Sequence, residues 1–241
     1  YTKSCDHIVT TGEKLRQTLI HTNDFPAQHI TSVRTGIDLD YFQPADKYEA
    51  RTKLGLDRDA FIIGIVATLR SWKGHRYLIR AFKQFSDQSS ILLIVGDGPQ
   101  WDALHRQVEE LGLQQRVFFT GRQDNIAEWM NVMDIFCLPS YANEGVPQAL
   151  MQSQACGVPA ITTLNGSINE AVIPGKTAFI VEPQDSDAIL AAIEALYNDK
   201  NRLSAMSEAC SLNAKSHFSK KQMVEKMLAI FSAAIESRLN K

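Results

Sequence analysis

The feature that most constrains the fold is a pair of short, continuously apolar runs. Residues Phe61–Ala67 read "FIIGIVA" and residues Ile91–Val95 read "ILLIV". Neither run shows the alternation of polar and apolar side chains that is typical of a strand with one wet face. Strands that are apolar on both faces are covered by helices on both sides, and this arrangement is characteristic of parallel sheets. The two runs therefore predict a parallel sheet at the centre of the fold.

Similar short runs alternate with amphipathic segments along most of the chain. Further strands are expected at His7–Thr11, Ile30–Val33, Val117–Thr120, Asp134–Leu138, Pro159–Thr163 and Ala178–Val181, and helices at Glu13–Thr22, Lys47–Leu54, His75–Phe85, Gln100–Leu111, Asn125–Val132, Pro147–Ala155 and Ser186–Asn198. This alternation predicts an α/β fold with a doubly wound parallel sheet. After Tyr197 the pattern becomes helical and ends in a helix over Ser219–Leu239, with Ser219 as its candidate N-cap.

Composition and charge exclude several classes of protein. The 241 residues contain 25 Lys and Arg and 27 Asp and Glu, without a basic block, so no nucleic-acid partner is expected. The longest apolar run, Phe61–Leu69, is too short to span a bilayer. The four cysteines form no CxxC pair, which argues against a zinc site and a redox motif and predicts buried thiols in a reducing compartment. We therefore expect a cytoplasmic protein. The cysteines are Cys5, Cys137, Cys156 and Cys210.

The loop after the first buried strand, Thr68–Gly74, reads "TLRSWKG". In an open parallel sheet, ligands bind beyond the carboxyl ends of the strands, where loops enter helices. Arg70 and Lys73 lie just before the helix expected from His75, where free N–H groups and the positive end of the helix dipole favour an anion. The pattern indicates a phosphate site, although two solvated cations on a surface turn would give the same letters.

A second helix start lies in Asn143–Ala149, "NEGVPQA". Gly145 permits close approach of a ligand to the backbone, and Pro147 suits the first position of a helix, which leaves the next two amides as free donors. At a rise of about 1.5 Å per residue, Glu144 and Gln152 would lie roughly 10 Å apart, a span that suits a nucleotide sugar. Alternatively, Glu144 only complements the helix dipole and Gln152 is a solvated helix residue.

Two glycine-containing stretches do not carry a nucleotide-binding fingerprint. Gly96–Pro99, "GDGP", lacks the third glycine of the dinucleotide motif, so its glycines are interpreted as a tight strand-to-helix turn. The triplet Gly175–Thr177, "GKT", has Glu170 where a phosphate-binding loop needs its first glycine, and it precedes an expected strand instead of a helix.

Several motifs in a fixed order give the chain a resemblance to a known family over nearly its full length. They are "VRTGIDLDYFQP", "VATLRSWKG", "IVGDGP", "VFFTG", "DIFCLPSYANEGVPQALMQSQACGVPAI" and "GSINEAVIPGKTAFIV". Together they resemble the retaining GT-B glycosyltransferases of family 4. The fold implied is the Rossmann-like C-terminal domain of a GT-B protein, with a helical C-terminus.

The resemblance implies a role for each motif residue in binding a nucleoside-diphosphate sugar, the donor. Glu144 would be the catalytic residue that faces the donor sugar. The other expected donor-site residues are Thr68, Arg70 and Lys73 for the diphosphate, Gly145, Val146, Pro147, Gln148 and Ala149 for phosphate or sugar, Gln152 for the ribose, and Gly121 and Arg122 for the base.

Two of these positions depart from the family's pattern. Thr68 stands where the family commonly has arginine, with Arg70 two residues further on. Gln152 stands where the family has the second glutamate of its Glu-x7-Glu signature. An amide still accepts one hydrogen bond, but it loses the charged, two-oxygen grip on a ribose diol. We therefore expect donor binding to persist, but to be weaker.

The resemblance also implies a reaction and its partners. The expected reaction transfers the sugar with retention of its anomeric configuration, without metal or cofactor, to a glycan or lipid-linked acceptor. Lipopolysaccharide or cell-envelope synthesis at the inner face of the membrane is the expected setting, with peripheral membrane contact at most. Alternatives are a catalytically silent GT-B domain that serves as a nucleotide-binding or assembly module, and a sugar-nucleotide epimerase.

The same resemblance divides the chain into three parts. Residues 1–45 resemble the end of the family's N-terminal, acceptor-binding domain and the linker; residues 46–216 resemble the donor-binding domain. Residues 217–241 resemble the helix that crosses back to the N-terminal domain. With so little of the acceptor domain present, we expect the 241 residues alone to bind nucleotide without transferring sugar.

Overall fold

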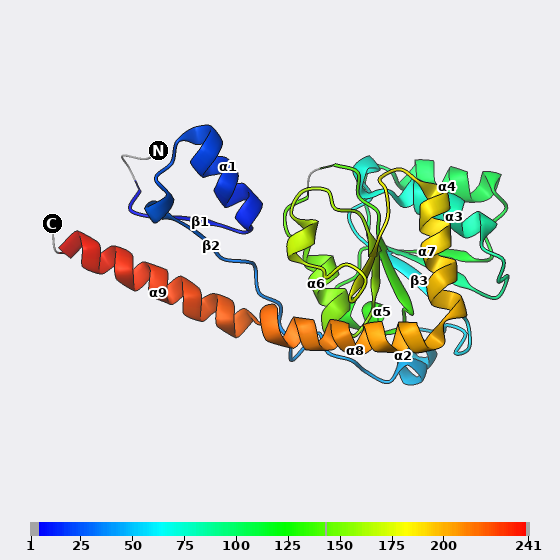
Figure 1. Cartoon of the computed structure of the whole chain (residues 1–241). Coiled ribbons are helices and arrows are strands. Elements are labelled where there is room, and N and C mark those ends of the chain that lie inside the picture. Colours follow the sequence, from blue (N-terminus) through cyan, green and yellow to red (C-terminus); the bar gives the residue numbers. More distant parts are fainter. Residues whose placement is uncertain (1–4, 143, 240–241) are drawn as a thin grey trace.

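The computed structural model describes residues 5–142 and 144–239. These residues form a short first unit, a central α/β body and two long helices at the C-terminal end (Figure 1). The strands are β1 (Ile8–Thr10), β2 (Ile30–Ser32), β3 (Ile62–Val66), β4 (Ile91–Val95), β5 (Val117–Gly121), β6 (Ile135–Leu138), β7 (Ala160–Thr162) and β8 (Ala178–Ile180).

The centre of the body is a parallel sheet of six strands in the order β5-β4-β3-β6-β7-β8. The two strands with continuously apolar sequences are neighbours, paired from Ile62 with Ile91 to Val66 with Val95. Their side chains are buried on both faces, as the absence of alternation predicted. The expected doubly wound parallel sheet is therefore confirmed.

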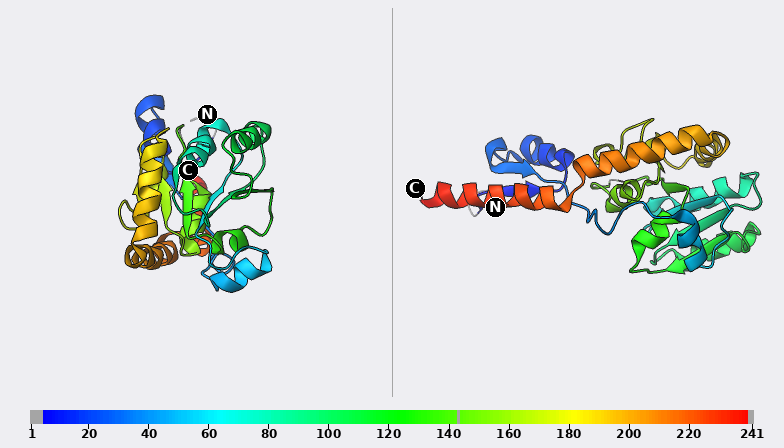
Figure 2. Two further views of the ribbon diagram at one scale, coloured as in Figure 1. Left: turned by 90° about the vertical axis from the view of Figure 1, so that its right-hand side faces the viewer. Right: turned by 90° about the horizontal axis from the view of Figure 1, so that it is seen from below.

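Helices cover both faces of this sheet. On one face α3 (His75–Gln84) packs against α4 (Trp101–Glu110) and α7 (Ser186–Asn198). On the other face α6 (Gln148–Ala155) packs against α5 (Ile126–Asn131) and α8 (Lys200–His217), and α5 also contacts α2 (Lys47–Lys53). The end-on view in Figure 2 shows the sheet between these helical layers.

The helices are held on the sheet by apolar stripes at helical spacing. In α3 the residues that face the core are Leu78, Ile79 and Phe82, all fully buried, so they recur every three to four positions. The first turns of α2, α7 and α8 are capped by aspartates: Asp46, Asp185 and Asp199 accept hydrogen bonds from the first free amides of their helices.

The first unit is β1, α1 (Glu13–Asn23), a single 3₁₀ turn at Ala27–His29 and β2, with β1 and β2 parallel. It lies apart from the sheet of the body, beside the long helix α9 (Lys220–Leu239) (Figure 1). The chain between them is fixed to the C-terminal helices, because the Ile37 amide donates to the Phe218 carbonyl at 2.6 Å and the Lys220 amide to the Ile37 carbonyl at 2.9 Å.

The expected helix over Ser219–Leu239 is α9, which begins at Lys220, so the break after α8 lies where the candidate N-cap Ser219 predicted it. Two differences from the sequence-based expectations are small. Element ends differ by one or two residues from those expected, as at Pro147, which precedes α6 instead of opening it. The expectation of buried thiols holds for Cys137, Cys156 and Cys210 but is wrong for Cys5, which is exposed near the start of the described chain.

In the described part of the chain, no helix has both the length and the apolar content that a membrane crossing requires.

Candidate functional site

The strand order places the candidate site at the centre of the sheet. Strands β3, β4 and β5 succeed one another toward one edge, whereas β6 returns to lie against the opposite side of β3. The order thus reverses between β3 and β6, and ligands of doubly wound folds bind in the crevice outside such a switch point. The two loops singled out from the sequence, Thr68–Gly74 and Asn143–Ala149, follow β3 and β6 respectively.

The loop after β3 is held in place by its neighbours. The Leu69 amide donates to the Asp97 carbonyl at 2.9 Å, and the Gln100 amide donates back to the Leu69 carbonyl at 3.0 Å. A side chain at Gly96 would come within 2.1 Å of the Ala67 carbonyl oxygen, so "GDGP" needs its glycines for close packing of two loops. The interpretation of this stretch as a tight turn is confirmed.

The end of the same loop lies against the strand-end loop of β6. Ser71–Lys73 forms a single 3₁₀ turn, and the next residue, Gly74, has φ +81°. A Cβ at Gly74 would lie 2.2 Å from the Pro139 carbonyl oxygen. The Tyr141 amide also donates to the Trp72 carbonyl at 2.8 Å. These contacts place Lys73 directly beside the chain that carries Glu144.

Lys73 and Glu144 form an ion pair. The Lys73 Nζ atom lies 2.7 Å from Glu144 Oε1, and the two side chains are 19% and 11% exposed. The pair lies in a partly desolvated position, where attraction between the charges is stronger than at an open surface. The structure therefore brings together the two residues that sequence reasoning assigned to the diphosphate and to the sugar.

The backbone of Glu144 is fixed from behind by a further loop. The Ser167 amide donates to the Glu144 carbonyl at 2.9 Å. Gly166 has φ +69°, and a Cβ there would lie 2.0 Å from the Glu144 carbonyl oxygen. The same loop is tied to the end of β6, since the Asn165 amide group and the Thr163 hydroxyl both donate to the Ser140 carbonyl, at 2.8 and 2.6 Å.

The other cation of the β3 loop is not part of this pair. Arg70 is exposed, and its guanidinium carbon lies 5.6 Å from the centre of the Trp72 ring. Thr68, which stands where the family commonly has arginine, lies on the same loop and is also exposed. Both residues therefore lie on the loop expected to meet the diphosphate, with side chains open to solvent.

The start of α6 supplies free backbone donors. Pro147 is its N-cap, with φ −70° and ψ 119°, and α6 begins at Gln148. The first two helical amides, of Gln148 and Ala149, donate to no acceptor within the described residues. Gly145 is exposed and Val146 packs in part against the core. The expected anion-friendly helix start is present, with the proline one position earlier than predicted.

The remaining residues expected at the site lie at the end of β5 and in α6, the helix that follows β6. Gln152 is half-buried on α6, and its side chain makes no hydrogen bond with the described residues. Gly121 ends β5 with φ +68° and accepts a hydrogen bond from the Gly96 amide at 2.9 Å. Arg122 follows it and is exposed. Their roles toward ribose and base stay predictions.

Sequence reasoning missed His75, the first residue of α3. Its ring is almost fully buried, and neither ring nitrogen has a hydrogen-bond partner within the described residues. Burial, together with the nearby charge of Lys73, lowers the pKa of His75 to about 3, so the ring is neutral at physiological pH. Its position right after a "KG" pair was the available signal.

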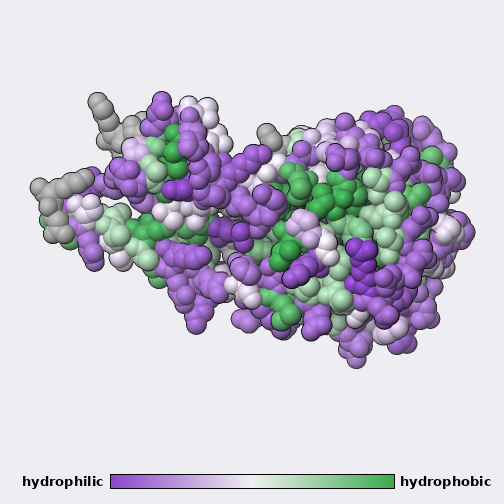
Figure 3. All heavy atoms as spheres, viewed as in Figure 1, coloured by the Kyte–Doolittle hydropathy of each residue, from purple (hydrophilic) through white to green (hydrophobic). Residues whose placement is uncertain are grey.

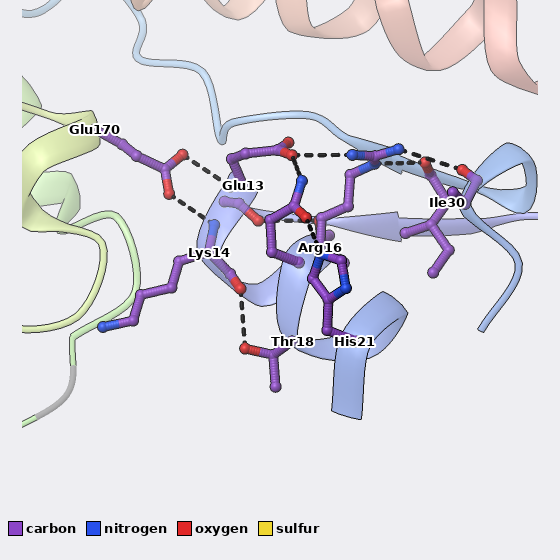
Figure 4. A network of polar contacts seen from close by, with 11 residues as sticks. Glu13, Lys14, Arg16, Thr18, His21, Ile30 and Glu170 are labelled. Carbon is purple, nitrogen blue, oxygen red and sulfur yellow. Dashed lines mark hydrogen bonds and ion pairs between the residues drawn. The ribbon is translucent and has the colours of Figure 1, made fainter. Parts of the chain in front are cut away.

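Sequence reasoning also missed the role of Glu170, which it named only as a residue that rules out a phosphate-binding loop. Glu170 ends a 3₁₀ turn over Ile168–Glu170, and its carboxylate accepts hydrogen bonds from the Glu13 amide at 2.9 Å and the Lys14 amide at 3.2 Å. Figure 4 shows this carboxylate at the N-terminal end of α1, where it bridges the body and the first unit.

In the described residues, no group of three or more His, Cys, Asp and Glu side chains is arranged to hold a metal ion.

The sheet order and the two helical layers define the chain as a Rossmann-like domain. The model of one family, described as "Glycosyl transferases group 1", matches residues 46–217. The chain therefore belongs to the group 1 glycosyltransferases.

Curated relatives agree with this assignment. The chain is 29% identical over 247 residues to a D-inositol 3-phosphate glycosyltransferase of Catenulispora acidiphila, with 97% of this chain and 58% of the relative aligned. It is 28% identical over 207 residues to an N-acetyl-alpha-D-glucosaminyl L-malate synthase of Bacillus anthracis, with 86% and 54% aligned. The chain thus spans somewhat more than half the length of these relatives.

Solved structures share the fold. HepE of Anabaena, solved with UDP, superimposes with a TM-score of 0.89 at 22% identity, covering 96% of this chain and 65% of HepE. WaaG, a glycosyltransferase involved in lipopolysaccharide biosynthesis, superimposes with a TM-score of 0.82 at 17% identity, covering 92% and 62%. At these identities the likeness establishes the fold.

Proposed function

We propose that this chain binds a nucleoside-diphosphate sugar at the switch point between β3 and β6, and that the whole protein transfers the sugar with retention, as in family 4. The observation that carries the proposal is the Lys73–Glu144 pair, which joins a cation and a carboxylate from two loops at the site where this fold binds ligands. Relatives solved with UDP support the nucleotide part of the donor.

Each group has a task in this reaction. The bond between the anomeric carbon and the diphosphate oxygen breaks, and Lys73 and the free amides of Gln148 and Ala149 stabilise the negative charge that develops on the diphosphate. Glu144 stabilises the positive charge on the sugar from the ring's other side. The acceptor hydroxyl then bonds to the anomeric carbon on the face that the diphosphate leaves. Its proton passes to the departing phosphate oxygen, which lies on that same face.

The donor's remaining contacts are assigned by position. Arg70 and Thr68 lie on the loop that meets the diphosphate, with Arg70 free to swing from Trp72 toward a phosphate. Gln152 would meet the ribose, and Gly121 and Arg122 would meet the base. We infer that no metal and no further cofactor is needed, because Lys73 and helix-start amides supply the positive charge that a metal ion supplies elsewhere.

The acceptor is proposed to be a glycan or a lipid-linked sugar, bound by an N-terminal domain in the full-length protein. A setting in lipopolysaccharide or cell-envelope synthesis, at the cytoplasmic face of the membrane, rests on the resemblance and on WaaG as a structural neighbour. The 241 residues alone are then expected to bind the donor without transferring its sugar.

A second candidate is a catalytically silent domain that serves as a binding or assembly module. It is favoured by two residues: Thr68, which brings no charge to the diphosphate loop, and Gln152, whose neutral amide replaces a carboxylate.

Calorimetric titration with UDP, ADP and GDP separates a donor-binding domain from an assembly module. We expect one of the three to bind with a Kd between about 1 µM and 1 mM, the range in which many enzymes hold their substrates. A screen of donor hydrolysis with the full-length protein would then identify the sugar. Absence of binding for all three nucleotides would contradict the proposal and favour the silent module.

A further inference from the structure

The first unit and the body meet at a polar contact of unusual form. Helix α1 starts after Gly12, which has no side chain and therefore cannot cap the helix. Its first amides, of Glu13 and Lys14, donate instead to the two carboxylate oxygens of Glu170, at 2.9 and 3.2 Å. A residue more than 150 positions away in the chain thus supplies the cap of α1 (Figure 4).

The packing around Gly12 shows that this approach is close. A Cβ at Gly12 would lie 3.1 Å from Glu170 Oε1, 3.2 Å from Val146 Cγ2 and 3.3 Å from Ser167 Oγ. Two of these neighbours belong to the loop that holds Glu144, and Val146 belongs to the candidate donor loop itself. The N-terminal end of α1 therefore packs against residues that border the candidate site.

Charge complements the contact. The positive end of the α1 dipole and the Glu170 carboxylate attract each other. Lys14 adds a hydrogen bond from its ammonium group to the Gly166 carbonyl at 3.4 Å. Arg34, on the chain that leaves the first unit, is electrostatically attracted to Glu170 while its own pKa is lowered by burial.

From Glu170 a short chain of contacts leads to Glu144. Glu170 ends the 3₁₀ turn that begins one residue after Ser167, and its amide donates to the Ser167 carbonyl at 3.0 Å. Ser167 is buried, and its own amide donates to the Glu144 carbonyl at 2.9 Å. Glu144 in turn holds Lys73 at 2.7 Å.

We propose that Glu170 is a positioning residue: by capping α1 it couples the seating of the first unit to the placement of Glu144 beside Lys73. Only the role of this coupling in catalysis rests on the proposed function. The coupling itself is a property of the α1–Glu170–Ser167–Glu144 contacts. A nucleotide that orders Glu144 is then expected to order the first turn of α1, and loss of the cap is expected to loosen Glu144.

Hydrogen exchange of the whole 241-residue chain tests this coupling. In Glu170→Ala, we expect amides 13 and 14 to exchange about tenfold faster or more, since their hydrogen-bond acceptor is gone. The Ser167 amide, which donates to the Glu144 carbonyl, is expected to exchange severalfold faster as well. Glu170→Gln keeps one acceptor oxygen and should restore part of the protection at both places. Glu182→Ala, an exposed glutamate on the same domain, is the matched control and should change neither.

The ligand-linked measurement distinguishes positioning from simple helix capping. With the nucleoside diphosphate selected by titration, the wild-type chain should gain protection at amides 13 and 14, and Glu170→Ala should not. Faster exchange confined to amides 13 and 14 in Glu170→Ala, with the Ser167 amide unchanged, would overturn the inference. If no nucleotide binds the wild-type chain, the proposed function fails, whereas the exchange result without nucleotide still decides the coupling.

Discussion

At the scale of single residues, the central feature is a cation and a carboxylate that neutralise each other. Lys73 and Glu144 are both largely buried and paired. Removing one partner of such a pair leaves an uncompensated charge and is costly, whereas exchanging one anion for another is not. Under the proposed function, a diphosphate would replace Glu144 as the counter-ion of Lys73, and the carboxylate would then face the sugar.

The neutral amide at position 152 gives a test by gain of function. Gln152→Glu restores a carboxylate that can accept two hydrogen bonds from a ribose diol, and such charged hydrogen bonds are roughly twice as strong as neutral ones. We expect nucleotide affinity to rise about threefold to tenfold in calorimetric titration. Gln114→Glu, which adds the same charge on the exposed loop before β5, is the control. Equal affinities of Gln152→Glu and the wild type would remove position 152 from the ribose site.

His75 predicts a pH dependence of stability. The unfolded chain takes up a proton at this residue near pH 6.5, but the folded chain resists protonation down to about pH 3 because the ring is buried. The free energy of unfolding therefore falls as pH falls through this window, by about 1.4 kcal/mol per pH unit.

Urea denaturation at pH 7 and pH 5 measures this effect. Relative to His75→Leu, which removes the titrating ring, the wild type should lose roughly 2 kcal/mol of unfolding free energy between the two pH values. Parallel changes in the two proteins would show that the His75 pKa is not depressed in the folded chain.

At the scale of elements, the loop after β3 depends on backbone contact as much as on side chains. Gly74 combines a left-handed φ of +81° with a Cβ direction that points at the Pro139 carbonyl. Gly112 has a similar φ of +66° but open space around it. The pair therefore separates backbone strain from close packing between β3 and β6 loops.

Chemical denaturation of the two alanine variants tests that separation. Gly112→Ala should lower the unfolding free energy by about 1 kcal/mol, the ordinary cost of a left-handed alanine. Gly74→Ala should lower it by about 3 kcal/mol or more, since strain and clash add, and it should also weaken nucleotide binding. Equal losses would mean that the Gly74–Pro139 contact is not tight.

The elements could be predicted from the sequence because their signals are local. The continuous apolar sequence of Ile91–Val95 and the apolar stripe of α3 each predict a buried element. The alternation of strands and helices along the chain predicts the parallel sheet. The break before α9 was also predicted, through the candidate N-cap Ser219. Its pairing with Ile37 was not predicted, because a contact between residues so far apart in the sequence leaves no local pattern.

The site was predictable only in part, for a related reason. Motif positions identified Lys73 and Glu144 separately, but their contact across 71 positions depends on β6 lying beside β3, which periodicity alone does not reveal. Glu170 was missed because it acts on a partner 157 positions away, and a carboxylate capping a distant helix leaves no local pattern.

At the scale of the whole molecule, the long helix α9 presents apolar surface to solvent. Val224, Leu228, Phe231 and Ile235 recur every three to four positions along it and are 42% to 60% exposed. A hollow of about 690 Å³ lies between α9 and the first unit. It is lined by Ile230 and Ala233 of α9 and by Phe25 and His29 of the first unit. Figure 3 shows apolar side chains along α9 where it passes the first unit.

The whole molecule therefore consists of a well-packed donor-type body and a first unit that meets it through few contacts, the Glu170 cap among them. Under the proposed function, the body holds the donor-binding residues, and the Glu170 cap links them to the first unit.

The most direct test of this account is the nucleotide affinity of Lys73→Gln. Lys83→Gln, an exposed lysine on the last turn of α3, serves as the matched control. Loss of a charged hydrogen bond to a diphosphate costs about 1.5–3 kcal/mol, so we expect Lys73→Gln to bind the selected nucleoside diphosphate at least about tenfold more weakly, with Lys83→Gln within about twofold of the wild type. An unchanged affinity in a folded Lys73→Gln protein would contradict the assignment of the β3–β6 switch point as the donor site.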